Sequence, residues 1–538
     1  MISFDYLTLK AFFEENKDFF KGARLQKIQQ PTRRDFVLTI RGDRTEKLYI
    51  NIDPQVYHIC FLSDKTYERR NITIPKKPPM FCMLLRKYLE GFRITGVNVP
   101  AYERIFEIFF ESYNELNEKI ELCLAIELMG KYSNVILYNR DTKIIIGCAH
   151  NVGAEKSRER ELAGTLPYIY PQRQEKSDIL RYFGELHYDL LNDDFVGLSK
   201  AFADQLRRNN ISLEKIKDYM ELKSEINPAV SDKEFSVYSE LLDNPRECSS
   251  VSEMIDEYFS LQQCKIIKRA LKLKLKNIVS PLHNKELKLS EKLSSQLRRK
   301  TNASKYKKFA DLIVANLYNN QDYQKQLTVT DWESGNDIVI PLDSKLTLKE
   351  NSQKYYQMYA KSKSAVERLE NLLDTSKLQA EYYEGILYSI ENSDELNDLF
   401  EILSECEELG LTKKNDNTQK KEVNVLQTEI DGFKVYVGKN NKQNDLIVSK
   451  LSSADDLWFH TQNCTGSHVL LKITDNKTPD DKVIYKCCKL AKKYSKASDS
   501  TKVGVIYTKR KYLKKPPKAN LGYVTYKNEQ EIIVSDNL

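Results

Sequence analysis

The most informative stretch of the chain reads Asp456-Leu-Trp-Phe-His-Thr-Gln-Asn-Cys-Thr-Gly-Ser-His-Val-Leu-Leu-Lys472. It contains one of only two tryptophans and two of the six histidines, and its Gly-Ser-His turn leads into an apolar strand. One interpretation is a strand end with a buried Trp458, a turn at Gly466, and His460 and His468 at the solvent edge. The other is a cluster of aromatic and imidazole groups suited to stacking on unpaired bases and contacting phosphates. The residues alone leave both interpretations open.

The spacing His460-x3-Cys464-x3-His468 is the arrangement in this stretch most like a metal site. Structural zinc sites use four ligands in closely spaced pairs. Only three candidates lie here, Cys487 and Cys488 downstream are adjacent, and no Cys-x-x-Cys pair occurs in the chain. We therefore predict that the chain holds no metal, and nothing in the sequence indicates another cofactor.

The composition is that of a large and mildly basic chain. Its 538 residues predict several domains, and 84 Lys and Arg against 77 Asp and Glu give a net charge of +7. Ten cysteines without paired spacing favour a reducing compartment. The sequence has neither a signal-peptide pattern nor a run of eighteen apolar residues. We expect a cytoplasmic protein without membrane contact, which disfavours a secreted adhesin.

Residues 1–173 alternate between strand patterns and turns, which predicts an α+β domain. Pro78-Pro-Met-Phe-Cys-Met-Leu-Leu-Arg-Lys-Tyr-Leu-Glu-Gly91 begins with proline, has a wide apolar face and ends in glycine, so it should form a short helix. The segments that are apolar or alternating at strand length are 24–29, 36–40, 47–52, 104–110 and 120–126.

Residues 174–250 are polar and helical in pattern. Within them, Phe195-Val-Gly-Leu-Ser199 resembles the glycine turn of a helix-hairpin-helix. The backbone N–H groups of such a turn can bind a phosphate. The alternative is that Gly197 only ends a helix.

Two long helical segments of opposite charge follow. Residues 251–306 contain 13 basic and five acidic side chains, whereas residues 356–410 contain four basic and 13 acidic. We predict that these arms pair antiparallel as a coiled-coil hairpin around a middle insert, residues 307–355. The alternative is two helices of an ordinary bundle. Pro281 should kink or split the first arm. The apolar side chains near heptad a and d positions are Leu261, Cys264, Leu271, Leu275, Ile278, Leu282 and Leu289, then Ala365, Leu369, Leu372, Tyr383, Ile386 and Ile390.

A polar segment, residues 411–428, predicts a flexible linker before the last domain, residues 429–538. That domain has 20 Lys and Arg against 12 Asp and Glu, the charge balance of a protein that binds a polyanion. Residues 486–496 place cations on an expected helix, and residues 508–518 add a second basic cluster. We predict that both clusters and the Trp458 turn form one RNA-facing surface.

Several of these segments resemble the NFACT family, which comprises ribosome-associated quality-control factors of the RqcH type. In the last domain the resemblance lies in residues 456–472 and in the Asn-rich loop Val437-Gly-Lys-Asn-Asn-Lys-Gln-Asn-Asp-Leu446. Earlier in the chain it lies in residues 27–31, 78–86, 127–130 with 133–134, 302–318, 338–344 and 350–356.

The resemblance implies a multidomain α+β fold. Its N-terminal domain would be similar to DNA-repair glycosylases of the Fpg type, followed by a helix-hairpin-helix, an antiparallel coiled-coil hairpin with a middle insert, and a small α+β C-terminal domain. Fpg-type enzymes attack with an amino-terminal proline. Here Ile2 and Ser3 follow the initiator Met1, so that nucleophile is missing.

The function implied by the resemblance is that of an adaptor, not an enzyme. Such proteins bind large ribosomal subunits, through rRNA and stalk-region proteins, that are stalled with a nascent chain and tRNA. Bacterial members recruit alanyl-tRNA for mRNA-independent alanine tailing, in which the ribosome makes the peptide bond. No catalytic residue is therefore expected. The alternatives are a nucleic-acid-processing enzyme that uses the Fpg-like domain and a surface fibronectin-binding adhesin.

The resemblance also implies two sets of binding residues. The family ties an early acidic residue and an Asp-Arg pair to tRNA recognition, and here Glu103 replaces the Asp of that pair. A different interpretation of Arg104 is an ion pair with the neighbouring Glu103 or Glu107 on a solvated strand face. The expected tRNA-binding residues are Asp5, Arg86, Glu103 and Arg104. The expected RNA- and ribosome-binding residues are Trp458, His460, Ser467, His468, Lys509, Arg510 and Lys511.

Overall fold

The computed structural model describes residues 4–70, 72–113, 117–153, 155, 160–300, 303–318, 322–413, 423–474, 478–517 and 519–535. The described residues up to Ile267 form one compact unit, and those from Lys268 onward form a second. We call them the N-terminal unit and the C-terminal unit. Lys518 and residues 414–422, most of the expected linker, lie outside the described residues.

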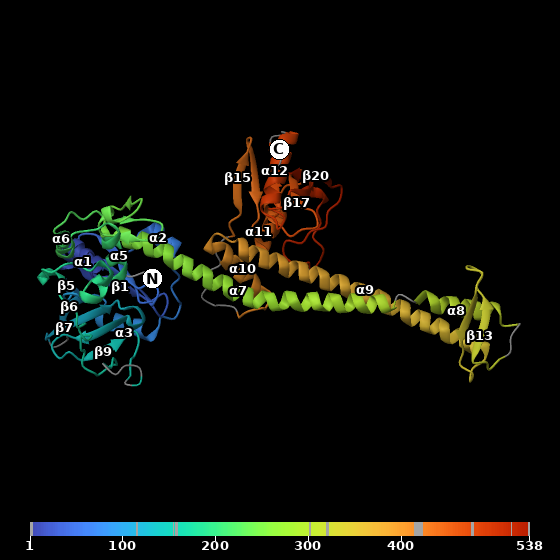
Figure 1. Ribbon diagram of the computed structural model, residues 1–538, viewed down its shortest axis with the longest axis horizontal. Helices are drawn as coiled ribbons and strands as arrows, with labels where there is room; N and C mark the ends of the chain where they lie inside the picture. Colours follow the sequence, from blue (N-terminus) through green and yellow to red (C-terminus); the bar gives the residue numbers. More distant parts are fainter. Residues whose placement is uncertain are drawn as a thin grey trace. The chain divides into compact units, whose positions relative to one another are not determined.

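The N-terminal unit is built from antiparallel sheets and short helices (Figure 1). Its first part contains α1 (Tyr6–Phe20), β1 (Arg24–Gln29), β2 (Asp35–Arg41), β3 (Thr45–Asn51), β4 (His58–Phe61), α2 (Asp64–Arg69), α3 (Met80–Leu89), β5 (Arg93–Asn98), β6 (Ile105–Tyr113), β7 (Lys119–Glu127), η1 (Gly130–Tyr132), β8 (Asn134–Asn139) and β9 (Ile145–Cys148). Its second part contains η2 (Ile179–Arg181), η3 (Tyr188–Leu190), α4 (Leu191–Asp194), α5 (Lys200–Arg208), α6 (Leu213–Glu221), β10 (Ala229–Val230), β11 (Phe235–Ser236), η4 (Ser239–Leu241) and β12 (Arg246–Glu247).

A nine-stranded antiparallel sheet, ordered β4-β3-β2-β1-β5-β6-β7-β8-β9, forms the first part of this unit. Aromatic side chains of α1, such as Phe12 and Phe20, pack against Phe61 and Phe106 of the sheet and are fully buried. The strand expected at 24–29 and the helix expected within 78–91 are confirmed as β1 and α3.

The long helix α7 (Val251–Lys300) begins inside the N-terminal unit, in whose core Val251, Met254 and Phe259 are fully or almost fully buried. The Asp256 carboxylate accepts hydrogen bonds from the Arg70 guanidinium and from Thr66 Oγ1, and both ionised side chains are at most 3% exposed. A buried pair of this kind is stable only because each charge is hydrogen-bonded. The first turns of the expected arm therefore belong to the core of the N-terminal unit.

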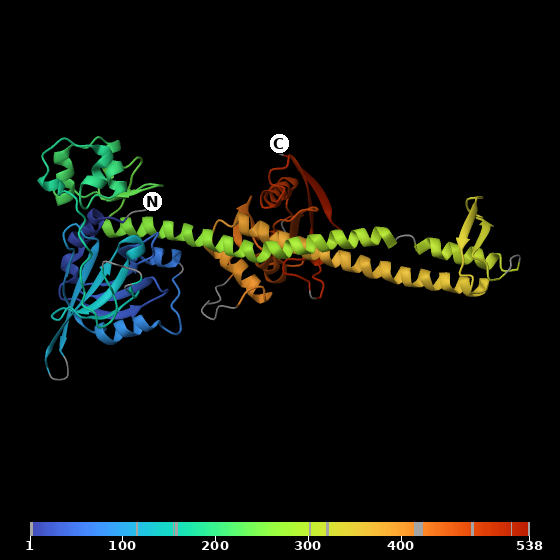
Figure 2. The ribbon, with the colours of Figure 1, turned by 60° about the horizontal axis from the view of Figure 1, so that its bottom comes forward.

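The C-terminal unit contains the rest of α7 and all later elements (Figures 1 and 2). These are α8 (Ala303–Ala315), β13 (Gln326–Thr330), β14 (Asp337–Pro341), α9 (Leu348–Asn392), α10 (Leu396–Glu408), β15 (Leu426–Ile430), β16 (Phe433–Val437), α11 (Asn441–Leu446), the π turn η5 (Ile447–Leu451), β17 (Leu457–Thr461), β18 (Val469–Leu471), α12 (Asp481–Lys493), β19 (Lys502–Lys509), η6 (Arg510–Tyr512) and β20 (Gln530–Ser535).

Helices α7 and α9 run antiparallel in this unit. Lys272 Nζ donates to the Glu391 carbonyl at 2.7 Å, and fourteen residues further along α7 the Glu286 carbonyl accepts from Ser376 Oγ at 3.0 Å. The residue number of the contact partner on α9 therefore falls as the residue number on α7 rises. Of the two expected effects of Pro281, the split is wrong, since α7 continues through this exposed proline, and the kink stays a prediction.

The apolar seam between the helices uses partly different positions from those that the sequence pattern indicated. Leu271, Leu275, Ile386 and Ile390 are buried there, and α10 adds buried side chains of its own. By contrast, the expected seam residues Leu261, Leu289 and Leu372 are exposed by 39%, 39% and 47%. Leu261 belongs to the N-terminal unit, and Leu293 and Leu373 are buried in place of Leu289 and Leu372. The middle insert has a separate small core between α8, α9 and the β13–β14 hairpin, formed by Phe309, Leu312, Ile313, Leu327, Val329, Ile340 and Leu348.

A six-stranded antiparallel sheet, ordered β15-β16-β18-β17-β19-β20, forms the last domain. Side chains alternate between the two faces of a strand. Phe459 of β17 packs toward α12. The Asp480 side chain caps the first turn of that helix. Trp458 packs on the opposite face with Ile447, Val448 and Leu513. Both faces of the sheet are therefore covered.

Candidate nucleic-acid interface

The loop before Arg104 is held in a strained conformation. Tyr102 has a φ of +62°, a value that side chains other than glycine and asparagine rarely adopt. Its hydroxyl donates to Asp178 Oδ1 at 2.6 Å, which fixes the loop between β5 and β6. Gly197, with a φ of +77°, lies so close that a Cβ atom there would be 2.8 Å from the Tyr102 ring. The turn expected to bind a phosphate therefore packs on Tyr102, and supports the loop that carries Glu103 and Arg104.

Arg104 is half-buried and makes no ion pair within the described residues. Its Nη1 donates to the Tyr57 hydroxyl at 3.1 Å, and the guanidinium lies 5.8 Å from the centre of that ring. Glu107 is only 1% exposed, and it accepts hydrogen bonds from Asn98 and Tyr170 instead. The alternative of an Arg–Glu pair on a solvated strand face is therefore wrong. Burial raises the pKa of the neighbouring Glu103, while Arg173 and Arg104 act in the opposite direction.

Asp5 and Arg86 are engaged by the protein itself. The Asp5 carboxylate caps α1, accepts from the Thr8 N–H at 2.9 Å and from Ser199 Oγ at 2.7 Å, and is 8% exposed. Arg86 Nε donates to the Ile28 carbonyl at 2.8 Å. Asp5 and Tyr57 line the same hollow of about 670 Å³, so Asp5 lies in the neighbourhood of Arg104, whereas Arg86 does not line it. Asp5 and Arg86 thus make contacts within the fold, which leaves them weaker candidates for tRNA contact than Arg104, and their expected contact with tRNA stays a prediction.

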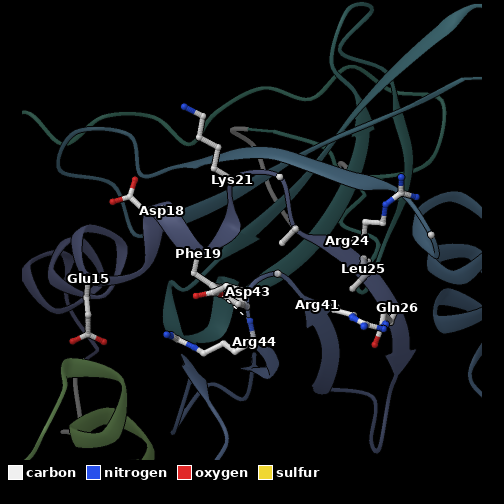
Figure 3. A pocket seen from close by; sticks show the side chains of 14 residues that line it. Glu15, Asp18, Phe19, Lys21, Arg24, Leu25, Gln26, Arg41, Asp43 and Arg44 are labelled. Atoms are coloured by element: carbon white, nitrogen blue, oxygen red, sulfur yellow. Dashed lines mark hydrogen bonds between the residues drawn. The ribbon is translucent and has the colours of Figure 1, made fainter.

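A row of arginines crosses three neighbouring strands of the N-terminal unit, and the sequence did not indicate it. Arg24 of β1 lies opposite Arg41 of β2 and opposite Arg93 of β5, and all three are exposed. Like charges on directly opposed residues destabilise a sheet unless an anion compensates. Arg24 and Arg41 line an open hollow of about 1160 Å³ with Lys21, although acidic side chains such as Asp43 line it too (Figure 3). Only strand register, which the sequence does not display, reveals the row.

In the C-terminal unit, Trp458, His460 and His468 do lie together. The ring centre of Trp458 is 5.7 Å from that of His460, with parallel planes, and 5.1 Å from that of His468, edge to face. Trp458 is only 1% exposed and His468 only 4%. The expectation that Trp458 and His468 offer a free stacking surface is therefore wrong, because α11, η5 and the segment after Tyr512 cover this side of the sheet.

Both histidines are neutral side chains in the folded protein. Burial lowers the pKa of His460, and it lowers the pKa of His468 well below the ordinary value. They cannot attract a phosphate as cations near neutral pH. Within the described residues, no three His, Cys, Asp or Glu side chains converge to hold a metal ion, including the His460, Cys464 and His468 set.

Ser467 and the turn before it have a structural role. Ser467 is buried, and its N–H donates to the Tyr494 carbonyl at 3.0 Å, at the end of α12. Gly466 approaches Ser495 so closely that a Cβ atom would be 2.9 Å from the Ser495 Cβ. The Gly-Ser-His turn therefore closes the sheet against α12, and its Ser467 does not face solvent.

The second basic cluster divides into one structural and two surface side chains. Arg510 Nε donates to the Val448 carbonyl at 2.8 Å and to Ser452 Oγ at 3.0 Å, which fixes η6 to the π turn. Lys509 and Lys511 are exposed and share the carboxylate of Asp455, at 3.4 Å and 3.2 Å. Arg510 thus has a structural role and its expected contact with RNA stays a prediction, while the two lysines are exposed to solvent.

Helix α12 carries the clearest cationic stripe of the domain. Lys482, Lys486, Lys489 and Lys493 are exposed and follow one another at intervals of four, three and four, which places them on one helical face. The apolar face of α12 packs against the sheet. The stripe and Trp458 therefore lie on opposite sides of the sheet, so the expected single RNA-facing surface is wrong.

The Asn-rich loop docks on acidic residues of α10. Asn440 Nδ2 donates to Glu401 at 2.7 Å, Gln443 Nε2 donates to the same carboxylate at 2.8 Å, and Asn441 Nδ2 donates to Glu405 at 2.9 Å. Side-chain amides are suited to this contact because they donate hydrogen bonds without adding buried charge. The loop thereby fixes the last domain on the helical hairpin within the C-terminal unit.

Two protein-family models match the chain. The NFACT N-terminal and middle domains match residues 5–424, which is well over half of the chain. The chain belongs to the NFACT family. The NFACT protein RNA binding domain matches residues 423–528, so the α12 stripe and the Trp458 strand both lie within the family's RNA-binding domain.

Individual relatives of this NFACT protein extend over almost the whole chain. It is 30% identical to the Rqc2 homolog RqcH of Bacillus subtilis (strain 168), with 99% of this chain and 98% of that protein aligned. It is 22% identical to the archaeal Rqc2 homolog aRqcH of Methanocaldococcus jannaschii, over 87% of this chain and 77% of that protein. A solved structure, the N-terminal part of the fibronectin/fibrinogen-binding protein from Streptococcus suis, is 28% identical with a TM-score of 0.42 and covers 48% of this chain and 99% of its own. In the described part of this NFACT protein, no helix is both long and apolar enough to cross a membrane.

Proposed function

We propose that this NFACT-family protein is a ribosome-associated quality-control adaptor. It binds stalled large ribosomal subunits, through rRNA and stalk-region proteins, and recruits alanyl-tRNA for mRNA-independent alanine tailing of the nascent chain. The observation that carries the proposal is the alignment with an Rqc2 homolog RqcH over 99% of the chain, together with the RNA-binding domain model at residues 423–528. The protein would work in the cytoplasm, where ribosomes translate.

The adaptor role divides between the two units. The N-terminal unit, which we propose to be Fpg-like with a helix-hairpin-helix, would hold tRNA without acting on it chemically. Arg104 is its best-placed contact, because a planar guanidinium donates in pairs to phosphates and base edges. The helical hairpin, which we propose to be a protruding coiled coil, would dock on the subunit. The ribosome would make the peptide bond, so the protein supplies no catalytic residue.

The α12 stripe supports RNA binding by the last domain. Lys482 and Lys493 make no ion pair within the described residues, whereas Lys486 is 2.7 Å from Asp431. A cation without an acidic partner has no ion pair to break when it contacts a phosphate. Each phosphate that such a lysine neutralises releases counterions, which makes the binding constant fall steeply with salt.

A salt titration of large-subunit binding tests this proposal. Wild-type protein should cosediment with purified large subunits at low salt and dissociate as salt rises. Changing Lys482, Lys486 and Lys493 to Ala should reduce the slope of log K against log salt by about 2, since each lost phosphate contact removes roughly 0.7–0.9. Lys509→Ala with Lys511→Ala is the matched control, because these lysines share Asp455 and should change the slope less. Absence of cosedimentation by the wild-type protein, even at low salt, would contradict the proposed function.

Arg104→Ala should weaken tRNA binding about tenfold to a hundredfold, because a hydrogen bond to a charged group contributes about 1.5–3 kcal/mol. Subunit binding should stay nearly unchanged. The measurement is tRNA copurified with the subunit-bound protein, with Arg86→Ala as a control whose guanidinium faces the Ile28 carbonyl. Equal tRNA recovery from wild type and Arg104→Ala would exclude this residue as the contact.

A further inference from the structure

The C-terminal unit contains a cavity that the functions above do not use. It has a volume of about 870 Å³ and is enclosed by α9, by the Trp458 face of the sheet and by the segment that precedes β20. Side chains from each wall include Gln379 of α9, Trp458 and His468 of the sheet, and Tyr526 of the segment. A cavity of this size is typical of small-ligand sites.

Two buried polar atoms on the sheet wall have no hydrogen-bond partner among the residues that the structure describes. They are Trp458 Nε1 and His468 Nδ1, on rings whose centres are 5.1 Å apart. Almost all buried polar atoms in proteins are paired, so each exception needs an explanation. The indole N–H can only donate, whereas the nitrogen of a neutral imidazole donates or accepts according to its tautomer. A ligand with a neighbouring acceptor and donor would satisfy both.

The rest of the lining mixes apolar side chains such as Leu378 and Val524 with polar ones, and its carboxylates are Glu381 and Glu384. It includes the side-chain amides of Asn441, Asn444 and Asn463, and Lys496, the one lysine among the described lining residues, pairs with the Glu384 carboxylate. Within this described lining, a phosphate would find no cation that lacks a carboxylate partner. A flat, uncharged group that carries hydrogen-bonding edges fits the lining better.

The helix wall is opened by a glycine in the interior of α9. Glycine in a helix interior makes the folded protein less stable than alanine would, by a free energy roughly similar to that of a weak hydrogen bond. A Cβ atom at Gly385 would lie at ordinary distances of 3.6 Å from Thr465 and 3.8 Å from Asn441, so alanine fits. A larger side chain at this position would project into the cavity. The absence of a side chain at Gly385 therefore keeps this part of the cavity open.

We propose that this cavity binds a single unstacked nucleobase of RNA, an inference that rests on the RNA-binding function proposed above. The base edge would accept from Trp458 Nε1 and pair with His468 Nδ1, while Tyr526 would stack on its face. Tyr526 is 38% exposed, and its ring centre is 5.9 Å from that of Trp458. Residues 519–526, which form this wall, lie outside helices and strands.

The chain provides its own reporter for this site. Its only other tryptophan, Trp332, is 59% exposed on the β13–β14 hairpin and can be changed to Phe. In full-length Trp332→Phe protein, all tryptophan emission then comes from Trp458. Single-stranded RNA hexamers are titrated in, against a ribose-phosphate hexamer that carries the same charges without bases. We expect a saturable change of Trp458 emission with the base-bearing hexamers alone, while anisotropy shows both kinds of hexamer bound to the lysines.

Variants distinguish binding of a nucleobase in the cavity from binding of the RNA phosphate backbone to the lysines. Gly385→Leu should abolish the emission change and Gly385→Ala should preserve it, while both still bind the abasic hexamer. Tyr526→Ala, at an exposed position, should weaken the response about tenfold through lost stacking. An equal response to the abasic hexamer, or no response while hexamers bind, would overturn the proposal. So would a response to a short uncharged peptide but not to RNA. Subunit cosedimentation is measured in parallel, so that its absence in the wild type identifies failure of the proposed function instead.

Discussion

Removal of the distal part of the helical hairpin should abolish stable association with the large ribosomal subunit and leave the rest of the protein folded. The deletion removes residues 288–374 and joins α7 to α9 by four or five turn-forming residues, the length that connects antiparallel helices. Glu286 and Ser376 are hydrogen-bonded across the hairpin, so the new ends already lie side by side. We expect the fraction that cosediments with subunits to fall at least tenfold.

The choice of end points decides whether this experiment is informative. The deletion removes the small core around Phe309 entirely but leaves the seam of Leu275 and Ile386 intact. A deletion that began at Val251 would instead take Asp256 from the N-terminal unit, leave the Arg70 guanidinium buried without its partner, and unfold that unit. The control is binding of single-stranded RNA by the shortened protein, which should match the wild type. Unchanged cosedimentation would show that the distal hairpin is not the docking arm.

Local patterns predicted the elements of this fold well. Strand β1 and helix α3 follow from alternation and from a proline start, and the long helices follow from continuous helical composition. The failures involve long-range contacts. Pro281 lies on the exposed side of α7, where packing of neighbouring turns on α9 outweighs one missing hydrogen bond. The heptad positions failed at Leu289 and Leu372, where Leu293 and Leu373 are buried instead, because a shift of one residue turns a side chain by about 100° around the helix.

The candidate site was harder to predict, because a polar side chain can bind either an external ligand or another group of the same protein. Asp5 is an acidic residue close to the start of the chain, but its oxygens are taken by Thr8 and by Ser199, almost two hundred residues away. Arg510 lies in a basic run, yet the Val448 carbonyl binds it. Neither contact is visible in the sequence. Arg104 could be selected because a family motif singled it out, and the structure adds that no described carboxylate pairs with it.

Trp458 illustrates a signal that was present and could have been used. Leu457, Trp458 and Phe459 are successive apolar residues of one strand, and successive side chains point to opposite faces. Three such residues in a row indicate a strand covered on both sides, so a tryptophan in the middle position belongs to a core. The sequence did not show which segments pack on the tryptophan side of the sheet. In the structure, η5 and Leu513 pack there.

Trp458→Ala should destabilise the C-terminal domain by about 3–5 kcal/mol, the range for removing a buried aromatic side chain. The ring is 1% exposed and fills the space between Ile447, Leu470 and Leu513, so its loss leaves a cavity. Trp458→Phe should cost less, because it keeps an aromatic ring and removes a buried N–H that has no partner. Trp332→Ala is the matched control: that ring is 59% exposed, and surface substitutions usually change stability by no more than about 0.5 kcal/mol.

Hydrogen exchange on the full-length protein is the suitable measurement, because a chain of several domains has no single unfolding free energy. Amides of β17 and β19 should exchange much faster in Trp458→Ala, while those of β6 and β7 in the N-terminal unit stay protected. Binding of RNA to the α12 stripe should fall in parallel, since the apolar face of α12 packs on the same sheet. Protection of β17 and β19 at the wild-type level would mean that Trp458 contributes little to the core. Its ring would then have to be considered again as a surface for stacking on RNA bases.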